Sequence, residues 1–245
     1  MSPPDPDRPA PRFLDAGETA LVVEFGTTVD PATSDRVFAL DDALRVDVPT
    51  GLRETVPTYR SLMIHYDPLT LDRADLVGHV ERLLGQAAAT RRAGRVWTMP
   101  CCYDPVIAED IAEAAGLAGL SPERLAGLHA RADYRVYMYG FAPGFAYLGG
   151  LPEPLAVPRR ASPRPPHPRN AVMIGGGLAA IATVPMPTGW YVVGRTPERL
   201  YAAEREAPFL VEGGDTLRFE PIDAATFADL DRRALAGETV ARRAA

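Results

Sequence analysis

The chain has 245 residues, of which 47% are hydrophobic, and its formal net charge is −6 at pH 7. This length allows two small domains or one large one, and the composition is ordinary for a globular protein. The negative charge argues against a broad basic surface, and no stretch approaches the roughly 20 apolar residues that span a bilayer, so neither nucleic acid nor a membrane is expected as a partner.

The first part of the chain is expected to form a small α/β domain over residues 12–90, after a disordered tail of residues 1–11. Apolar runs predict the strands, and an aspartate before a proline or before a helically spaced apolar stripe predicts each helix start. The predicted order is strand, helix, two strands and helix, at residues 20–25, from Asp30, within 53–66, and from Asp72 to Gly85. The alanine- and arginine-rich stretch 86–95 marks the expected domain boundary.

Residues 96–245 are expected to form a second, mainly β domain, which makes the overall fold class α+β. Helices are predicted to open at Asp104-Pro105 and Ser121-Pro122, and a polar helix at about 223–236 closes the chain. Between Gly140 and Trp190 proline and glycine dominate, which indicates long loops with short regular pieces near 171–174 and 179–184. Strands are predicted at 96–99, 134–139, 190–194 and 216–219, as in a barrel or closed sandwich.

Most of the common catalytic patterns are missing. Cys101 and Cys102 are adjacent and therefore poor disulfide partners, which fits a reducing, cytoplasmic setting, and a buried thiol is favoured over a nucleophile at Cys102. The four histidines are scattered, so no metal site is expected. There is no phosphate loop and no GxSxG elbow. The glycine cluster 175–177 is either a tight turn or a place where a substrate approaches the backbone.

Two adjacent stretches are unusual. Residues 158–169 hold four arginines among five prolines, and a stiff loop that presents guanidinium groups suits a carboxylate or a phosphate. A solvated basic loop or a protein interface would explain the same composition. Residues 140–150 place three aromatic residues among four glycines and a proline. Such rings need a pocket, a partner protein or a small local core to cover them.

These stretches also carry a family resemblance. Residues 139–152 resemble the signature GFxPGFxYLGGLP, residues 158–164 resemble PRRxxPR, and Trp190 with residues 194–197 resembles GWxxIGRTP. Shorter elements at residues 24–26 and 57–68 agree as well. The sequence thus resembles the B-type subunits of bacterial 5-oxoprolinase, a family also labelled KipI-like, allophanate hydrolase subunit 1, or carboxyltransferase domain, subdomain C and D.

The resemblance implies a small α/β domain followed by a cyclophilin-like β-barrel. It also implies a partner of the 5-oxoprolinase C-type or allophanate hydrolase subunit 2 type, and in some assemblies an A-type partner as well. The expected activity is ATP-dependent opening of 5-oxoproline or a related lactam or amide, with ATP bound through the complex and with no metal or biotin site in this chain. Arg159 and Arg164 are expected to be catalytic. The expected substrate contacts are Tyr139, Phe141, Phe145, Arg160, Gly175, Gly176 and Leu178.

The chain departs from the family pattern after Ile174. Polar or aromatic family positions have become Leu178, Ala179, Ala182 and Met186. Loss of hydrogen-bonding side chains changes the selectivity of a pocket, so a less polar substrate or a loss of activity is implied. Two other functions stay open: a non-catalytic inhibitor of a sensor histidine kinase, as some family members are, and a carboxyltransferase-type component beside a biotin-dependent carboxylase.

Overall fold

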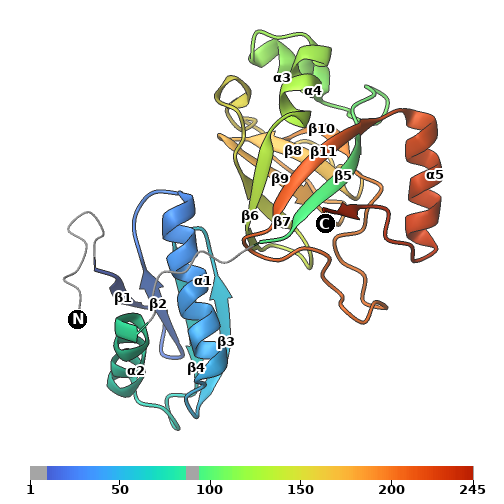
Figure 1. Ribbon diagram of the computed structural model, residues 1–245. Helices are drawn as coiled ribbons and strands as arrows, with labels where there is room; N and C mark the ends of the chain where they lie inside the picture. Colours follow the sequence, from blue (N-terminus) through green and yellow to red (C-terminus); the bar gives the residue numbers. More distant parts are fainter. Residues whose placement is uncertain (1–9, 87–93, 245) are drawn as a thin grey trace. The chain divides into compact units, whose positions relative to one another are not determined.

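A computed structural model describes residues 10–86 and 94–244, and the chain divides into two compact units between residues 93 and 94 (Figure 1). Nearly all of the expected tail, residues 1–11, lies outside the described residues, as does most of the expected boundary at 86–95. Each unit has its own hydrophobic core.

The N-terminal unit is a four-stranded antiparallel sheet with two helices packed on it. Its strands lie in the order β1-β2-β4-β3, and the core joins the sheet to both helices through residues such as Val23, Leu40 and Leu76. Asp30 caps the first helix as predicted, because its carboxylate accepts a 2.9 Å hydrogen bond from the Thr33 amide. The elements are β1 (Arg12–Asp15), β2 (Ala20–Glu24), α1 (Pro31–Val46), β3 (Leu52–Pro57), β4 (Ser61–Tyr66) and α2 (Arg73–Gln86).

The C-terminal unit is a closed β-barrel. Seven strands follow one another in the order β10-β8-β9-β7-β6-β11-β5, and a pairing of Arg195 with Cys102 joins β10 back to β5. The expected α+β fold with a C-terminal barrel is confirmed. The barrel strands are β5 (Val96–Cys102), β6 (Asp133–Tyr139), β7 (Ala146–Gly149), β8 (Ala171–Gly175), β9 (Leu178–Ala182), β10 (Tyr191–Arg195) and β11 (Thr216–Ile222).

Alternation along the strands divides the barrel residues between two clusters. One face of all seven strands fills the interior, with residues such as Met99, Tyr134 and Ile181. The helices α3 (Ile111–Leu117) and α4 (Pro122–Ala130) add side chains to this interior core, whereas α5 (Ala224–Leu235) lies beside the barrel (Figure 1). A short strand, β12 (Arg242–Arg243), pairs with β5. The opposite faces of β7 to β10 form a separate cluster outside the barrel.

Two local predictions in this unit need correction. The helix expected from Asp104 begins later, at Ile111, because Asp104 instead closes a turn: its carbonyl accepts from Ile107 and Ala108, and its carboxylate accepts from the Val106 amide. Strand β7 lies at the start of the stretch 140–190, where long loops are expected and no strand is predicted before residue 171. The helix start at Ser121 is confirmed, since its hydroxyl accepts from the Arg124 amide.

Candidate functional site

The second cluster, which we call the outer-face cluster, is the structural centre of the candidate site. Its buried members project from β8, β9 and β10 and from the ends of the loops that flank them. Leu178 and Met186 pack against it as partly buried neighbours. The buried members are Phe145, Ala171, Met173, Ala180, Ala182, Trp190 and Val192.

The aromatic residues of the two family motifs form a row across this cluster. The ring centroids of Phe141 and Phe145 are 6.0 Å apart, those of Phe145 and Tyr147 are 4.8 Å apart, and Tyr147 lies 6.3 Å from Trp190. Phe145 is buried, whereas Phe141 is 77% exposed. The structure therefore brings together two of the predicted substrate-binding aromatics, but only one of them is covered by the chain itself.

Arg159 lies at the edge of this row. Its guanidinium carbon is 5.1 Å from the centre of the Trp190 ring, a cation–π geometry. A Cβ atom placed on Gly176 would come within 3.5 Å of the Arg159 Nε atom, so the arginine also lies close to the turn between β8 and β9. Among residues 10–86 and 94–244, no carboxylate forms an ion pair with Arg159. This guanidinium is thus positioned by stacking and keeps its donors available.

Arg160 and Arg164 have a different environment. Both form ion pairs with the buried Asp110, at 3.0 Å from Arg160 and 2.6 Å from Arg164. Arg160 also pairs with Glu113 at 2.6 Å, and Arg164 pairs with Glu109. Because hydrogen bonds to these carboxylates favour the charged guanidinium, the pKa of Arg164 is raised even though burial opposes this. These ion pairs hold residues 158–169, which we call the arginine loop, against the start of α3.

Backbone bonds hold the same loop against a second segment. The Arg160 amide donates to Gly189, the Arg164 amide to Thr188, and the His167 amide to Met186, at 2.8 to 3.1 Å. Asp110 also accepts a 2.8 Å hydrogen bond from the Val192 amide of β10. This bond ties the group of arginines and carboxylates around Asp110 to the barrel. The expectation of a stiff arginine-bearing loop therefore has a structural basis in this paired backbone as well as in proline.

The glycine cluster forms the hairpin turn between β8 and β9. Gly175 pairs with Leu178, and the two residues between them, Gly176 and Gly177, have φ of 62° and 77°. Positive φ at both central residues is the requirement of a two-residue type I′ turn, so the tight-turn interpretation explains the cluster. Gly175 also allows the Trp190 ring to approach, because an added Cβ would lie 3.3 Å from it.

Tyr139, at the end of β6, serves the fold. Its hydroxyl donates a 2.5 Å hydrogen bond to the Val211 carbonyl, and its ring lies 5.2 Å from that of Phe209. Burial raises the pKa of this phenol above its usual value. Both polar and apolar parts of Tyr139 are therefore engaged within the chain, which separates it from the aromatic row.

The substitutions that distinguish this chain from its family pattern gather at the same place. Leu178, Ala182 and Met186 belong to the outer-face cluster or pack against it, whereas Ala179 points into the barrel interior. Three of the four apolar replacements thus belong to or pack against the cluster that contains Trp190. Of these, Leu178 and Met186 are partly exposed and offer van der Waals contact, but no side-chain hydrogen bond, to an apolar group.

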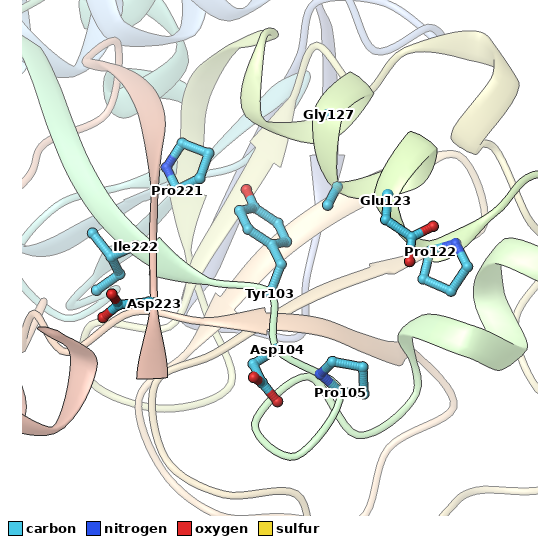
Figure 2. Close-up of a pocket in the computed structure, with 10 residues that line it drawn as sticks. Tyr103, Asp104, Pro105, Pro122, Glu123, Gly127, Pro221, Ile222 and Asp223 are labelled. Carbon is cyan, nitrogen blue, oxygen red and sulfur yellow. The ribbon is translucent and has the colours of Figure 1, made fainter. Parts of the chain in front are cut away.

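Two cavities are lined by residues outside the outer-face cluster. One of about 490 Å³ is lined from the β5–α3 turn, α4 and the start of α5, and Figure 2 shows its Tyr103, Asp104, Glu123 and Asp223 side chains. Asp104 and Asp223 already accept hydrogen bonds from backbone amides. The other, of about 370 Å³, is in the N-terminal unit beside His65 and Asp67. No predicted site residue lines either cavity.

Other candidate groups are also accounted for. Cys101 and Cys102 are free and buried, and burial raises the pKa of both thiols. Over residues 10–86 and 94–244, the structure contains no group of three His, Cys, Asp or Glu side chains suited to hold a metal ion. In the same residues no helix has the length and hydropathy of a membrane span.

Most of the chain matches one protein family. Residues 11–211 match the family described as "Carboxyltransferase domain, subdomain C and D". The chain belongs to this family. Two relatives, each named as the B subunit of 5-oxoprolinase, are similar to it: the Escherichia coli O157:H7 protein is 35% identical over 206 residues (84% of this chain, 93% of that protein), and the Bacillus subtilis (strain 168) protein is 30% identical over 214 residues (83% and 89%).

A solved structure shows that the same fold can occur in a longer chain. The crystal structure of TTHA0988 is 37% identical to this chain with a TM-score of 0.75, and the match covers 84% of this chain. It covers only 40% of the TTHA0988 chain, so more than half of that polypeptide lies outside the match. The proteins similar to this chain thus include two that are named as a subunit and one that continues into further sequence.

Sequence reasoning missed Asp110, which connects two of the predicted site arginines. A signal for it exists, because residues 109–113 hold three carboxylates that can pair with the dense arginine loop. It also missed that Trp190, noted as part of a motif, supports Arg159. No local pattern could show this, since the two residues come from different loops.

Proposed function

We propose that this chain is one component of a heteromeric, ATP-dependent amidohydrolase that opens 5-oxoproline or a related lactam together with a partner of the 5-oxoprolinase C type. One observation carries the proposal. The Arg159 guanidinium stacks on the Trp190 ring, and Arg159 has no carboxylate partner among the described residues. A 5-oxoprolinase A-type chain is the second partner we propose. The names of the relatives and the family membership support the class of complex.

The proposed chemistry follows from the weak electrophilicity of a lactam amide. Transfer of the γ-phosphoryl group of ATP to the lactam oxygen releases ADP and forms a good leaving group at the amide carbon. One water adds to that carbon and the ring C–N bond breaks as the nitrogen takes up a proton, which leaves an acyl phosphate. A second water hydrolyses this acyl phosphate, so that phosphate and the open amino acid are released. A fixed cation near the reacting oxygen stabilises the charge that develops on it, and the proposal assigns this role to Arg159.

The neighbouring residues take supporting roles in this proposal. Leu178 and Met186 offer apolar contact to the body of the substrate, because they are the partly exposed neighbours of the cluster that holds the buried Phe145 and Trp190 rings. The turn at Gly176 brings backbone close to Arg159. ATP is held by the assembled complex.

Two of the predicted site arginines have a different role in the same proposal. Arg160 and Arg164 act as positioning residues, because Asp110 and its acidic neighbours occupy their donors. They hold the loop that carries Arg159 and do not themselves contact the substrate. This changes the expectation for Arg164, which the family motif suggests as catalytic.

The test is an activity assay on the reconstituted complex. The chain is co-expressed with the C-type and A-type proteins of its own organism, and ADP release is measured with and without 5-oxoproline and a series of less polar lactams. Lactam-dependent ADP release supports the proposal. Release that no lactam stimulates, with autophosphorylation of a sensor kinase falling when the chain is added, would favour the inhibitor function instead.

A further inference from the structure

A patch of exposed and partly exposed apolar side chains adjoins the outer-face cluster. It lies on three loops of the barrel unit, and we call it the docking patch: Phe141, Pro143, Val184, Tyr201 and Phe209. Phe141 is 77% exposed, Phe209 43% and Val184 39%. Apolar groups of this size gathered on one surface are typical of places where another protein binds.

The three loops form one continuous surface because they are bonded to one another. The Thr183 hydroxyl, next to Val184, donates a 2.7 Å hydrogen bond to the Pro143 carbonyl. Gly144 packs so tightly on Tyr201 that an added Cβ would lie 2.5 Å from the Tyr201 Cβ. Tyr201 in turn pairs with Phe209, with ring centroids 5.1 Å apart. The patch is therefore built into the barrel and is not a set of independent side chains.

Phe141 is held in an unfavourable conformation within this patch. Its φ is 68°, in the left-handed region that bulky residues rarely adopt, and this conformation costs roughly 1–2 kcal/mol. Asparagine or glycine would fit the same backbone at lower cost. Burial within the chain does not offset the strain, because the ring is mostly exposed. An exposed, strained aromatic residue is the arrangement expected of a contact with another molecule.

We infer that the docking patch is where the partner polypeptide binds, and that the occupant is the chain corresponding to the unmatched part of TTHA0988. In that relative, a region 37% identical to this chain belongs to a longer polypeptide, so the matched and unmatched parts occur in equal number. The partner's matching surface is apolar, with a recess for the Phe141 ring. The identity of the partner rests on the proposed function, whereas the location of the docking patch does not.

The position of the patch links binding to the site. Phe141 lies 6.0 Å from Phe145, which begins the aromatic row that ends at Trp190 and Arg159. A partner seated on Phe141 therefore contacts the exposed end of a row whose Phe145 and Trp190 rings are already buried within the chain. This shifts the role of Phe141 from substrate contact to partner contact.

The experiment measures association and turnover separately. The full chain is titrated by calorimetry with the purified polypeptide from the same organism that resembles the unmatched part of TTHA0988. Two patch variants are used, Phe141→Asn, which relieves the backbone strain, and Phe209→Ser. The matched control is Val106→Ser, which removes an exposed apolar side chain elsewhere on the barrel unit. Thermal unfolding and lactam-dependent ADP release of each variant are recorded alongside.

We expect Phe141→Asn to weaken association about 30-fold or more while the unfolding temperature stays equal or rises, as for an aromatic residue at the centre of an interface. Phe209→Ser weakens it as well, and Val106→Ser does not. Wild-type association that Phe141→Asn leaves unchanged overturns the docking patch while the proposed function stands. A chain that does not bind this polypeptide at all, or that instead forms a homodimer disrupted by Phe141→Asn, overturns the inference in favour of no partner or of a second copy.

Discussion

The guanidinium of Arg159 lies 5.1 Å from the centre of the Trp190 ring. This contact fixes the arginine without using its hydrogen-bond donors, in contrast to Arg164, whose donors reach Asp110 and Glu109. Two arginines of one loop are thus held by different forces. The difference allows their roles to be separated by experiment.

Replacing Arg159 by alanine is expected to lower the kcat/KM of lactam-dependent ADP release about 100-fold or more, as for loss of one preorganised donor at a reacting oxygen. The free energy of unfolding should change by less than about 1 kcal/mol, because only a cation–π contact is lost. The control is Arg124→Ala, on the exposed side of α4. Steady-state kinetics with denaturant unfolding checks both, and a variant with full turnover would remove Arg159 from the site.

Replacing Arg164 by alanine is expected to destabilise the fold by about 3 kcal/mol, because it leaves the buried Asp110 with one fewer cation. Arg164→Lys should recover part of the loss, since lysine restores the charge but not the fork. Urea unfolding measures the change. If Arg164→Ala unfolded like the wild type yet lost turnover in the complex, a direct catalytic contact would replace the positioning role.

Replacing Gly176 by alanine is expected to reduce stability by about 1–2 kcal/mol, because φ of 62° is unfavourable for a residue with a Cβ. Gly127→Ala in α4 is the matched control, and it should have the opposite sign and stabilise by about 0.5–1 kcal/mol, since open space surrounds that helical position. Thermal unfolding of both variants provides the comparison. Equal effects of the two would argue against the type I′ turn.

Stability should fall on acidification because of His129. This histidine is fully buried beside Tyr103, and burial lowers its pKa to about 3. The unfolded chain takes up a proton near pH 6.5 while the folded chain does not, so stability is lost as the pH falls from about 6.5 towards 3, by up to about 1.4 kcal/mol per pH unit. His129→Asn should show a shallower loss over this range than the wild type in urea titrations at each pH. Parallel curves would contradict this origin.

The capped helices and apolar strands could be predicted because their signals are local. Asp30 and Ser121 cap helices where the sequence predicts them. Asp104 has the same signal, an aspartate before a proline, but its hydrogen bonds close a turn and the helix begins only at Ile111. The side-chain hydrogen bonds of an aspartate can stabilise either a turn or the start of a helix. Here the turn forms at Asp104, and the helix begins at Ile111, whose side chain packs in the interior core of the barrel unit.

The candidate site was only partly predictable. Composition identified the arginine loop and the aromatic loop, and a motif pattern joined them to one family. Asp110 forms ion pairs with Arg160 and Arg164 but not with Arg159. Its position depends on the hydrogen bond from the Val192 amide of β10, a contact between distant parts of the sequence that no local pattern predicts. Strand β7 escaped prediction because its four residues, Ala146–Gly149, gain their strand conformation from pairing with β6 and β9 on either side.

The way in which the barrel closes has a consequence for its biosynthesis. Strand β5 is the first of the barrel to be made, yet its long parallel neighbour β11 and the short β12 come last. During translation the edge of β5 that pairs with β11 stays open to pairing with other molecules until Ile222 has left the ribosome. Premature release or truncation before that residue should therefore yield an aggregating product, and chaperone demand should be concentrated on this interval.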